Sequence, residues 1–322
     1  MEAEFDRIDR RLLAELDRNS RQSYSQIAKK LRLGNDLIEY RIRRYVAEGY
    51  IGRFSAVVDP LSAGWWVFKH YLKLNSGSKK LKRLLLFLGS HPRTYWLAEL
   101  HGRFDLLVSI CVSNPAEGQR FQDELHSQFG DIIREQQICV LTSVVRFSKK
   151  YLTGGSGLEY EFAHRSDASK LTAEDAQLAN LLYLDARQSL GELARRLSVS
   201  PATVSRRIEM LERRGIILGY RFQLNYAALD MLLFKLLVQP TDHSTTFNDK
   251  LRAFCREHPQ VTCFIRQLGP FPLEIEVEVN GFSEMNSFVE EFRERFDSGI
   301  SAAEALLIKE DRFHRFPEDS PS

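Results

Sequence analysis

The chain contains an internal repeat, and this repeat constrains its fold more than any other feature. Residues 31–51, "LRLGNDLIEYRIRRYVAEGYI", align without a gap with residues 197–217, "LSVSPATVSRRIEMLERRGII". Further along the chain the offset grows by one residue, and His91-Pro92 then match His258-Pro259. The chain therefore consists of two copies of one unit, and any predicted fold must be built twice.

Length and composition indicate an ordinary multidomain protein. The 322 residues exceed the length of one typical domain. No apolar run approaches the ~20 residues of a membrane-spanning helix, and the N-terminus "MEAEFDRIDR" is charged, unlike a signal peptide. Cys111, Cys139, Cys255 and Cys263 lack the spacing of a metal site or a disulfide framework. We therefore expect a cytoplasmic protein with reduced core cysteines, no membrane segment, no metal and no cofactor.

The first part of each copy has the pattern of three short helices. In the second copy Thr172 and Ser189 are good N-caps, and leucines follow each of them at helical spacing. Ser200 and Pro201 start the third helix, because proline fits the first helical position, and Gly215 ends it. The tight turn "SVS" separates the second and third helices, and "IILGYRFQL" follows as a strand or wing. This pattern predicts a winged helix-turn-helix.

The second part of each copy predicts a strand, a helix, two strands, a helix and a strand. We expect these elements at residues 66–74, 78–89, 94–101, 105–112, 115–129 and 138–147, and again at 232–239, 246–258, 261–267, 273–279, 283–296 and 301–309. This order is the ferredoxin-like βαββαβ arrangement. The predicted fold class is α+β, with two tandem copies of a winged helix-turn-helix domain followed by a ferredoxin-like domain. The predicted boundaries are 1–60, 61–152, a Gly/Ser-rich linker at 153–170, 171–225 and 226–316.

The third helix of copy two has one apolar face and a small, polar outer surface. On a helical projection Val204, Ile208 and Leu211 share the face that we expect to be buried. Small residues and hydroxyls allow a close approach to the major groove, and arginine can bind guanine through two hydrogen bonds. The residues expected to contact DNA are Ser200, Pro201, Ala202, Thr203, Ser205, Arg206, Arg207 and Arg213. The alternative is that these arginines form only a solvated helix surface.

The corresponding helix of copy one is more acidic. Asp36 and Glu39 lie in or near its first turn, where they would repel phosphates. The candidate DNA contacts of this copy are Tyr40, Arg41, Arg43 and Arg44. We expect copy one to bind DNA more weakly than copy two, or with a different preference.

The stretch "DARQSLGELARRLSVSPATVSRRIEMLERRGII" resembles the DNA-binding signature of the Lrp/AsnC (leucine-responsive/asparagine regulator) family of transcriptional regulators. The resemblance extends over both copies, nearly the whole chain. It implies ferredoxin-like domains that pair into dimers and bind amino acids or similar small molecules at interfaces. The effector-binding residues that it implies are Gly102, Arg103 and Asp105 of the family motif "GRFD", with Thr142 and Ser143 of the last strand. A ligand-free turn at Gly102, capped by Asp105, is the alternative.

The two ferredoxin-like segments carry opposite charge. Residues 61–152 have a net charge of +6, with 13 basic and 7 acidic residues, whereas residues 226–322 have −7, with 10 and 17. Opposite charge favours pairing of the two segments with one another over pairing of either with itself. We expect this pairing within the chain, and a homo-oligomer of such chains. Separate solvated acidic faces at "EIEVEV" and "VEEFRER" are the alternative.

These features predict a sequence-specific regulator that binds double-stranded DNA and is not an enzyme. The main rival is a sirohaem decarboxylase, since those enzymes resemble this architecture, sometimes as two fused copies. The chain offers His101 and Arg103 at the corresponding stretch but lacks the Asn and Trp-Phe of those enzymes. An adaptor that modulates a related regulator without contacting bases is the third hypothesis.

Overall fold

The computed structural model describes residues 5–75, 80–154, 157–164, 171–319 and 321. Its helices are α1 (Arg7–Arg18), α2 (Tyr24–Leu31), α3 (Asn35–Ala47), α4 (Leu81–Ser90), α5 (Pro115–Phe129), α6 (Lys150–Thr153), α7 (Ala173–Leu184), α8 (Leu190–Leu197), α9 (Pro201–Arg213), α10 (Thr245–Glu257) and α11 (Phe282–Phe296), with 3-10 turns η1 (Ala227–Leu229) and η2 (Asp297–Gly299). Its strands are β1 (Ile51–Val58), β2 (Trp66–Leu74), β3 (Thr94–His101), β4 (Leu106–Val112), β5 (Ile133–Arg146), β6 (Tyr160–Ala163), β7 (Ile217–Leu224), β8 (Leu232–Pro240), β9 (Val261–Leu268), β10 (Leu273–Val279) and β11 (Ile300–His314). Each copy thus has three helices, a strand, and then the predicted βαββαβ order. None of the described helices is both long and apolar enough to cross a lipid bilayer.

The predicted helix starts of copy two are confirmed. The side chains of Thr172, Ser189 and Ser200 each accept a hydrogen bond from the backbone N–H three residues ahead. Such a cap satisfies one of the free N–H groups at a helix start and contributes about 1 kcal/mol. Pro201 occupies the first turn of α9, and Gly215 follows its end with φ of +66°, which favours glycine. Local sequence therefore determines the boundaries of the helix-turn-helix.

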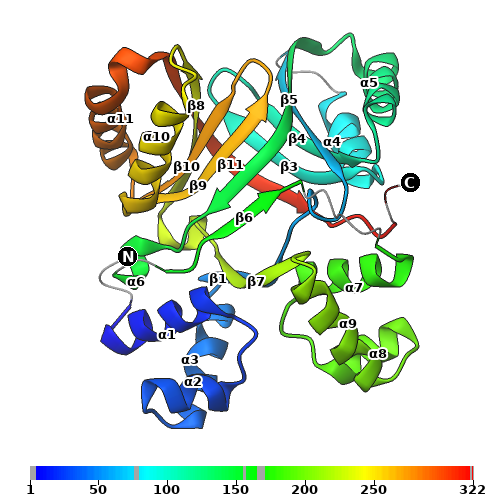
Figure 1. Cartoon of the computed structure of the whole chain (residues 1–322), viewed down its shortest axis with the longest axis vertical. Coiled ribbons are helices and arrows are strands. Elements are labelled where there is room, and N and C mark those ends of the chain that lie inside the picture. Colours follow the sequence, from blue (N-terminus) through cyan, green and yellow to red (C-terminus); the bar gives the residue numbers. More distant parts are fainter. Residues whose placement is uncertain (1–4, 76–79, 155–156, 165–170, 320, 322) are drawn as a thin grey trace.

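The two ferredoxin-like domains join into one closed antiparallel barrel. Within each copy the last strand pairs with the first, the first with the third and the third with the second. Between copies β3 pairs with β11, and β9 pairs with β5, so the order β2-β4-β3-β11-β8-β10-β9-β5 returns to β2. Figure 1 shows α4 and α5 outside one half of the barrel and α10 and α11 outside the other. The predicted pairing within the chain is confirmed, and it leaves these eight strands without a free edge.

Each copy places a glycine where it meets the other copy. Gly102 has φ of +134°, and a Cβ there would lie 2.8 Å from Cδ2 of Leu306 in β11. Gly269 has φ of +132°, and a Cβ there would lie 2.6 Å from the carbonyl oxygen of Ile138 in β5. Only glycine combines this backbone conformation with so close an approach. These turns therefore help to close the barrel.

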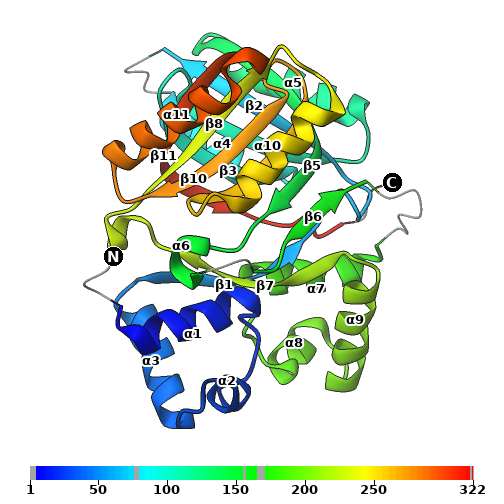
Figure 2. The same ribbon diagram turned by 60° about the vertical axis from the view of Figure 1, so that its left-hand side comes forward.

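The strands that follow the two third helices do not form separate wings. β1 and β7 pair with one another, antiparallel, in a two-stranded ribbon. The ribbon lies between the barrel and the six helices of the helix-turn-helix units (Figure 2). It therefore joins the two units to one another beneath the barrel.

The predicted linker at 153–170 is in part a structured element. Within it, Tyr160–Ala163 form β6, which pairs with the end of β5. Phe162 is buried there, and Arg221 donates hydrogen bonds to the carbonyls of Leu158 and Phe147. A local sequence window shows glycine and polar content but not the edge of β5 with which this strand pairs. Residues 155–156 and 165–170 lie outside the described part.

The inside of the barrel holds a buried ion cluster that links the copies. Lys69 of β2 and Lys235 of β8 both contact the carboxylate of Glu274 in β10, the latter at 2.9 Å. Lys235 also contacts Glu276 at 2.6 Å, and the Tyr71 hydroxyl donates to Glu274 at 2.8 Å. The side chain of Glu274 is fully buried. Buried charges are tolerated only when paired and hydrogen-bonded, so this cluster requires both copies.

Candidate nucleic-acid interface

The two helix-turn-helix units lie together on the side of the ribbon opposite the barrel (Figure 1). In copy two the predicted apolar face of α9 is buried, with Val204 and Leu211 fully covered and Ile208 nearly so. Burying each of these side chains contributes about 1.5–3 kcal/mol. Packing of this face fixes which residues of α9 face outward.

The outward face of α9 contains an unpaired cation. Ala202 and Arg206 are exposed, and Thr203 and Ser205 are half-buried at its flanks. Within the described chain Arg206 has no acidic partner, so its guanidinium is free to contact phosphate or base. Arg213 is also exposed, and its Nε donates to the carbonyl of Glu209 at 3.4 Å. Pro201 is exposed at the helix start, beside the backbone N–H groups that can face a phosphate.

Arg207 differs from Arg206 because it points into the domain. It contacts Asp175 of α7 at 3.0 Å and Glu174 at 3.9 Å. The Asp175 side chain is almost fully buried. The structure therefore gives Arg207 a role in fastening α9 to α7, and its contact with DNA stays a prediction.

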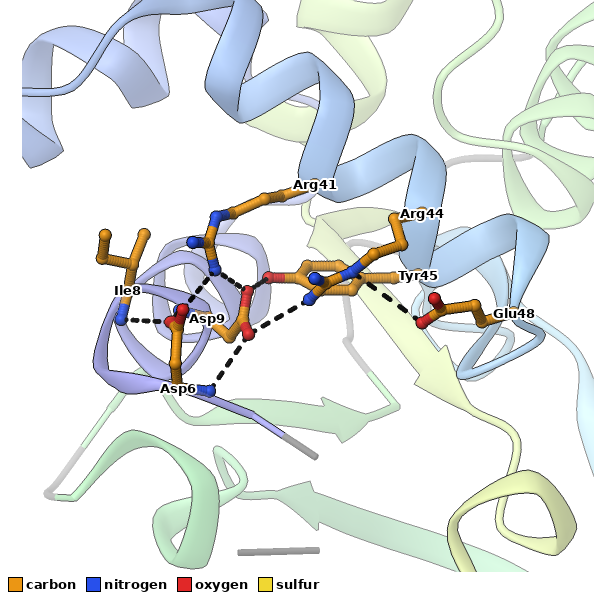
Figure 3. A network of polar contacts seen from close by, with 7 residues as sticks. All are labelled: Asp6, Ile8, Asp9, Arg41, Arg44, Tyr45 and Glu48. Carbon is orange, nitrogen blue, oxygen red and sulfur yellow. Dashed lines mark hydrogen bonds and ion pairs between the residues drawn. The ribbon is translucent and has the colours of Figure 1, made fainter. Parts of the chain in front are cut away.

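In copy one the arginines of α3 form ion pairs with carboxylates of the same unit (Figure 3). Arg41 contacts Asp6 at 2.9 Å and also Asp9, and Arg44 contacts Asp9 at 3.1 Å. The hydroxyl of Tyr45 donates to the same Asp9 carboxylate. Burial would raise the pKa of Asp9, but the hydrogen bonds from Tyr45 and Arg41 hold it below its usual value. The carboxylate is therefore charged and occupied.

Every arginine of the α3 helix thus has an acidic partner. The side chain of Arg41 is only 14% exposed, and Arg44 lies 3.8 Å from Glu48 in addition to Asp9. Arg43 is exposed but contacts Glu39 at 2.6 Å. Tyr40 is exposed and remains available. The expectation that copy one has the weaker DNA-binding surface stays a prediction, and this pairing of its cations gives it a physical reason.

Two arginines that match in the repeat hold the units together. Arg187 of copy two donates to the carbonyls of Ser20 and Gln22, at 2.6 and 3.2 Å. In return Arg21 of copy one donates to the carbonyls of Ala186 and Gln188, the second at 3.2 Å. No role was predicted for these two arginines, although they occupy equal positions of the repeat. With the ribbon, they fix the relative position of α3 and α9.

The comparisons with known proteins agree with this architecture. A model of winged helix-turn-helix DNA-binding domains matches residues 5–51 and 178–217. An uncharacterized HTH-type transcriptional regulator of Pyrococcus horikoshii, PH0140, is 28% identical over 144 residues, 45% of this chain and 90% of that protein. Another, PYRAB16920 of Pyrococcus abyssi, is 30% identical over 126 residues, 35% of this chain and 77% of that protein. The chain belongs to the Lrp/AsnC type of helix-turn-helix transcriptional regulators. It is a tandem duplication of that unit.

A solved enzyme has the same whole-chain architecture as this tandem Lrp/AsnC-type chain. The crystal structure of the siroheme decarboxylase NirDL covers 95% of this chain and 93% of its own, with a TM-score of 0.63 and 14% sequence identity. At this identity the likeness shows the fold alone. The shared feature is a pair of units with their sheets joined.

The effector residues implied by the family resemblance do not meet within one chain. Arg103 contacts Glu135 at 2.6 Å, near the start of β5, whereas Thr142 and Ser143 lie seven and eight residues further along that strand. At about 3.3 Å per residue, Glu135 and Thr142 are more than about 20 Å apart along the strand. Asp105 caps the end of β2, because its carboxylate accepts from the Leu74 N–H at 2.7 Å. The turn and cap are thus present, and effector binding at these residues stays a prediction.

Proposed function

We propose that this Lrp/AsnC-type chain is a sequence-specific regulator that binds double-stranded DNA, with α9 as its main recognition helix. The proposal rests on which arginines of the two helices have acidic partners. Arg206 is exposed and lacks an acidic partner in the described chain, whereas Arg41, Arg43 and Arg44 of α3 all contact carboxylates. A free guanidinium at the N-terminal part of a recognition helix can bond guanine O6 and N7.

The two helices are unequal, so the proposed DNA site is asymmetric. A dimer with identical units favours a palindrome, because its symmetry is repeated in the operator. Here one unit presents Arg206 and the other presents Tyr40 at the corresponding position. The proposed operator therefore has one half that is strongly specified and one that is weakly specified.

Selection of bound fragments from random double-stranded DNA tests the proposal. The wild type, Arg206→Ala and Arg43→Ala are compared at about 150 mM salt, where non-specific phosphate binding is weakened. We expect an enriched motif that loses its preference at one position in Arg206→Ala and keeps it in Arg43→Ala, since Arg43 is an exposed arginine with a partner. Absence of a motif in the wild type, or identical motifs in all three proteins, would contradict the proposal.

A tetrapyrrole decarboxylase is the second candidate, and the whole-chain likeness to NirDL is the observation that favours it. The residues offered for this chemistry give it little support. His101 is exposed at the end of β3, and Arg103 is engaged by Glu135 and Glu304. An absorbance titration with sirohaem distinguishes the two candidates, because binding and decarboxylation would shift the spectrum of the tetrapyrrole.

Oligomerisation of whole chains is a separate prediction, and light scattering after size exclusion measures it.

A further inference from the structure

A cavity of about 180 Å³ lies between the end of the barrel and the β1–β7 ribbon. Its walls come from both layers. Arg53 and Val57 of β1 and Gln223 of β7 line it from the ribbon, while Ser109 of β4 and Arg146 of β5 line it from the barrel. The cavity is thus placed where the DNA-binding layer meets the barrel, well apart from the outward face of α9.

Most charged groups of this cavity already have a partner. Glu276 is bound by Lys235, and Glu278 is bound by Lys149 at 2.6 Å. Burial would raise the pKa of Glu276, but the positive charges of Lys235 and Arg146 lower it to about 2. Asp311 accepts from the indole N–H of Trp96 at 2.9 Å. Each of these three acids therefore already has a partner.

Two guanidinium groups at the cavity have no acid within ion-pair distance in the described part of the chain. Within the described chain neither Arg53 nor Arg146 forms an ion pair, and the Nε atom of each is buried without a hydrogen-bond partner. Arg53 lies over the ring of Tyr183 at 5.2 Å, and Arg146 over that of Phe162 at 5.5 Å. A buried donor without a hydrogen bond is unfavourable, and more so when the group is charged. Both arginines therefore favour an anion in the space beside them.

Aromatic residues form much of the remaining wall, namely Tyr95, Trp96, Phe147, Phe162, Tyr183, Phe222 and Tyr226. An inorganic anion would leave these rings without contact, whereas an organic acid can place its body against them. A dry cavity of about 150 Å³ accommodates benzene, so this one suits a molecule with on the order of ten non-hydrogen atoms. A tetrapyrrole is several times larger.

We propose that this cavity binds a small carboxylate with an apolar or aromatic body, held at its carboxylate by Arg146 and Arg53. The ligand contacts the ribbon and the barrel together, so it stabilises one position of the ribbon relative to the barrel. Because the ribbon connects the two helix-turn-helix units, occupancy changes how they are presented to DNA. This regulatory consequence rests on the proposed DNA-binding function, whereas ligand binding itself does not.

Calorimetric titration of the full chain without DNA tests the binding. The probes are benzoate, which has both a charge and a ring, benzyl alcohol, which has the ring only, and acetate, which has the charge only. We expect saturable binding of benzoate, weaker binding of both other probes, and a loss of about tenfold or more in Arg146→Gln. The control Arg252→Gln removes a half-buried arginine of α10 that contacts Glu161 and does not line the cavity, and we expect it to bind benzoate as the wild type does.

Several outcomes would overturn the proposal. These are no saturation by benzoate, phenylacetate or 4-methylvalerate up to about 10 mM, equal binding of benzyl alcohol, or equal binding of acetate. Should Arg146→Gln fail to fold, Arg53→Gln gives the same test from the ribbon side. Selection of DNA fragments in the presence and absence of benzoate is a separate measurement, so failure of DNA binding does not obscure the result in the cavity.

Discussion

The buried ion cluster of the barrel provides the sharpest test of how the copies are held together. Substituting Glu274→Leu removes the carboxylate that Lys69 and Lys235 share, and leaves Lys69 buried without an acid. Breaking a buried pair in this way costs about 3–5 kcal/mol. Lys69→Met should lower the free energy of unfolding by less, about 1.5–3 kcal/mol, because Glu274 keeps its contacts with Lys235 and the hydroxyl of Tyr71.

The double variant Lys69→Met/Glu274→Leu is expected to recover most of this loss. It leaves Lys235 paired with Glu276 at 2.6 Å, and it places at position 274 the residue that copy one has at Leu107. Replacing a buried ion pair by apolar residues of similar size is often neutral. The double variant should therefore lie within about 1 kcal/mol of the wild type, with a coupling energy of at least about 3 kcal/mol.

Urea and thermal unfolding, followed by the fluorescence of the 3 tryptophans, measure these values. For a chain of 322 residues, Glu274→Leu should lower the Tm by about 4–7 °C. The control Glu310→Leu makes the same change in β11 but removes an exposed pair with Arg312, which costs less than about 1 kcal/mol. Equal losses in Glu274→Leu and the double variant would refute the reasoning, because Lys69 would then not be the charge that Glu274 neutralises.

Three further predictions concern the junctions between copies and the cores beneath the helices. Arg187→Met removes two hydrogen bonds to the carbonyls of copy one, so it should cost about 1–3 kcal/mol in unfolding and broaden the range of half-site spacings accepted in DNA selection. Gly269→Ala places a Cβ 2.6 Å from a backbone oxygen of β5, so it should destabilise the protein by about 1–3 kcal/mol. The control is Gly89→Ala in helix α4, where a Cβ meets nothing within 4 Å and the protein should gain up to about 1 kcal/mol of stability. Urea titration of both variants measures the two changes. Burial lowers the pKa of His70 to about 3 from its usual 6.5, so below pH 6.5 the unfolded chain binds a proton that the folded chain does not, and stability falls as the pH drops. Between pH 6.5 and 4 this contribution is about 3 kcal/mol, and His70→Gln should show a correspondingly shallower loss in urea titrations across that range; an unchanged slope would mean that another group causes it.

The sequence alone predicted the local structure well, because caps and periodicity act over a few residues. Ser200, Pro201 and Gly215 determine the ends of the third helix, and Val204 and Leu211 determine its buried side. The orientation of Arg207, which belongs to the predicted DNA-binding surface, shows what a local pattern leaves out. Its direction depends on Asp175, thirty-two residues earlier, and no helical projection contains that information.

The strand "LEIEVEV" shows why the buried ion cluster of the barrel could not be predicted from the sequence. Its alternation correctly placed Glu274, Glu276 and Glu278 on one face and the apolar residues on the other. The alternative interpretation took the acidic face to be solvated, as isolated acidic faces usually are. In the structure these glutamates face the inside of the closed barrel, where Lys69 and Lys149 of copy one and Lys235 of copy two neutralise them. Which face of a strand meets solvent depends on long-range pairing, which no local pattern records.

The position of these glutamates also explains why the two copies pair with one another. Both copies carry the lysine of the first strand, Lys69 and Lys235, but copy one has Leu107, Ser109 and Cys111 where copy two has the glutamates. Two copy-one domains would therefore bury two lysines without an acid, and two copy-two domains would bury an excess of carboxylates. Each self-pair leaves unpaired charges in the interior, which costs several kcal/mol per ion. The barrel is thus specified by buried charge as well as by the covalent fusion, and the two recognition helices beneath it are free to differ.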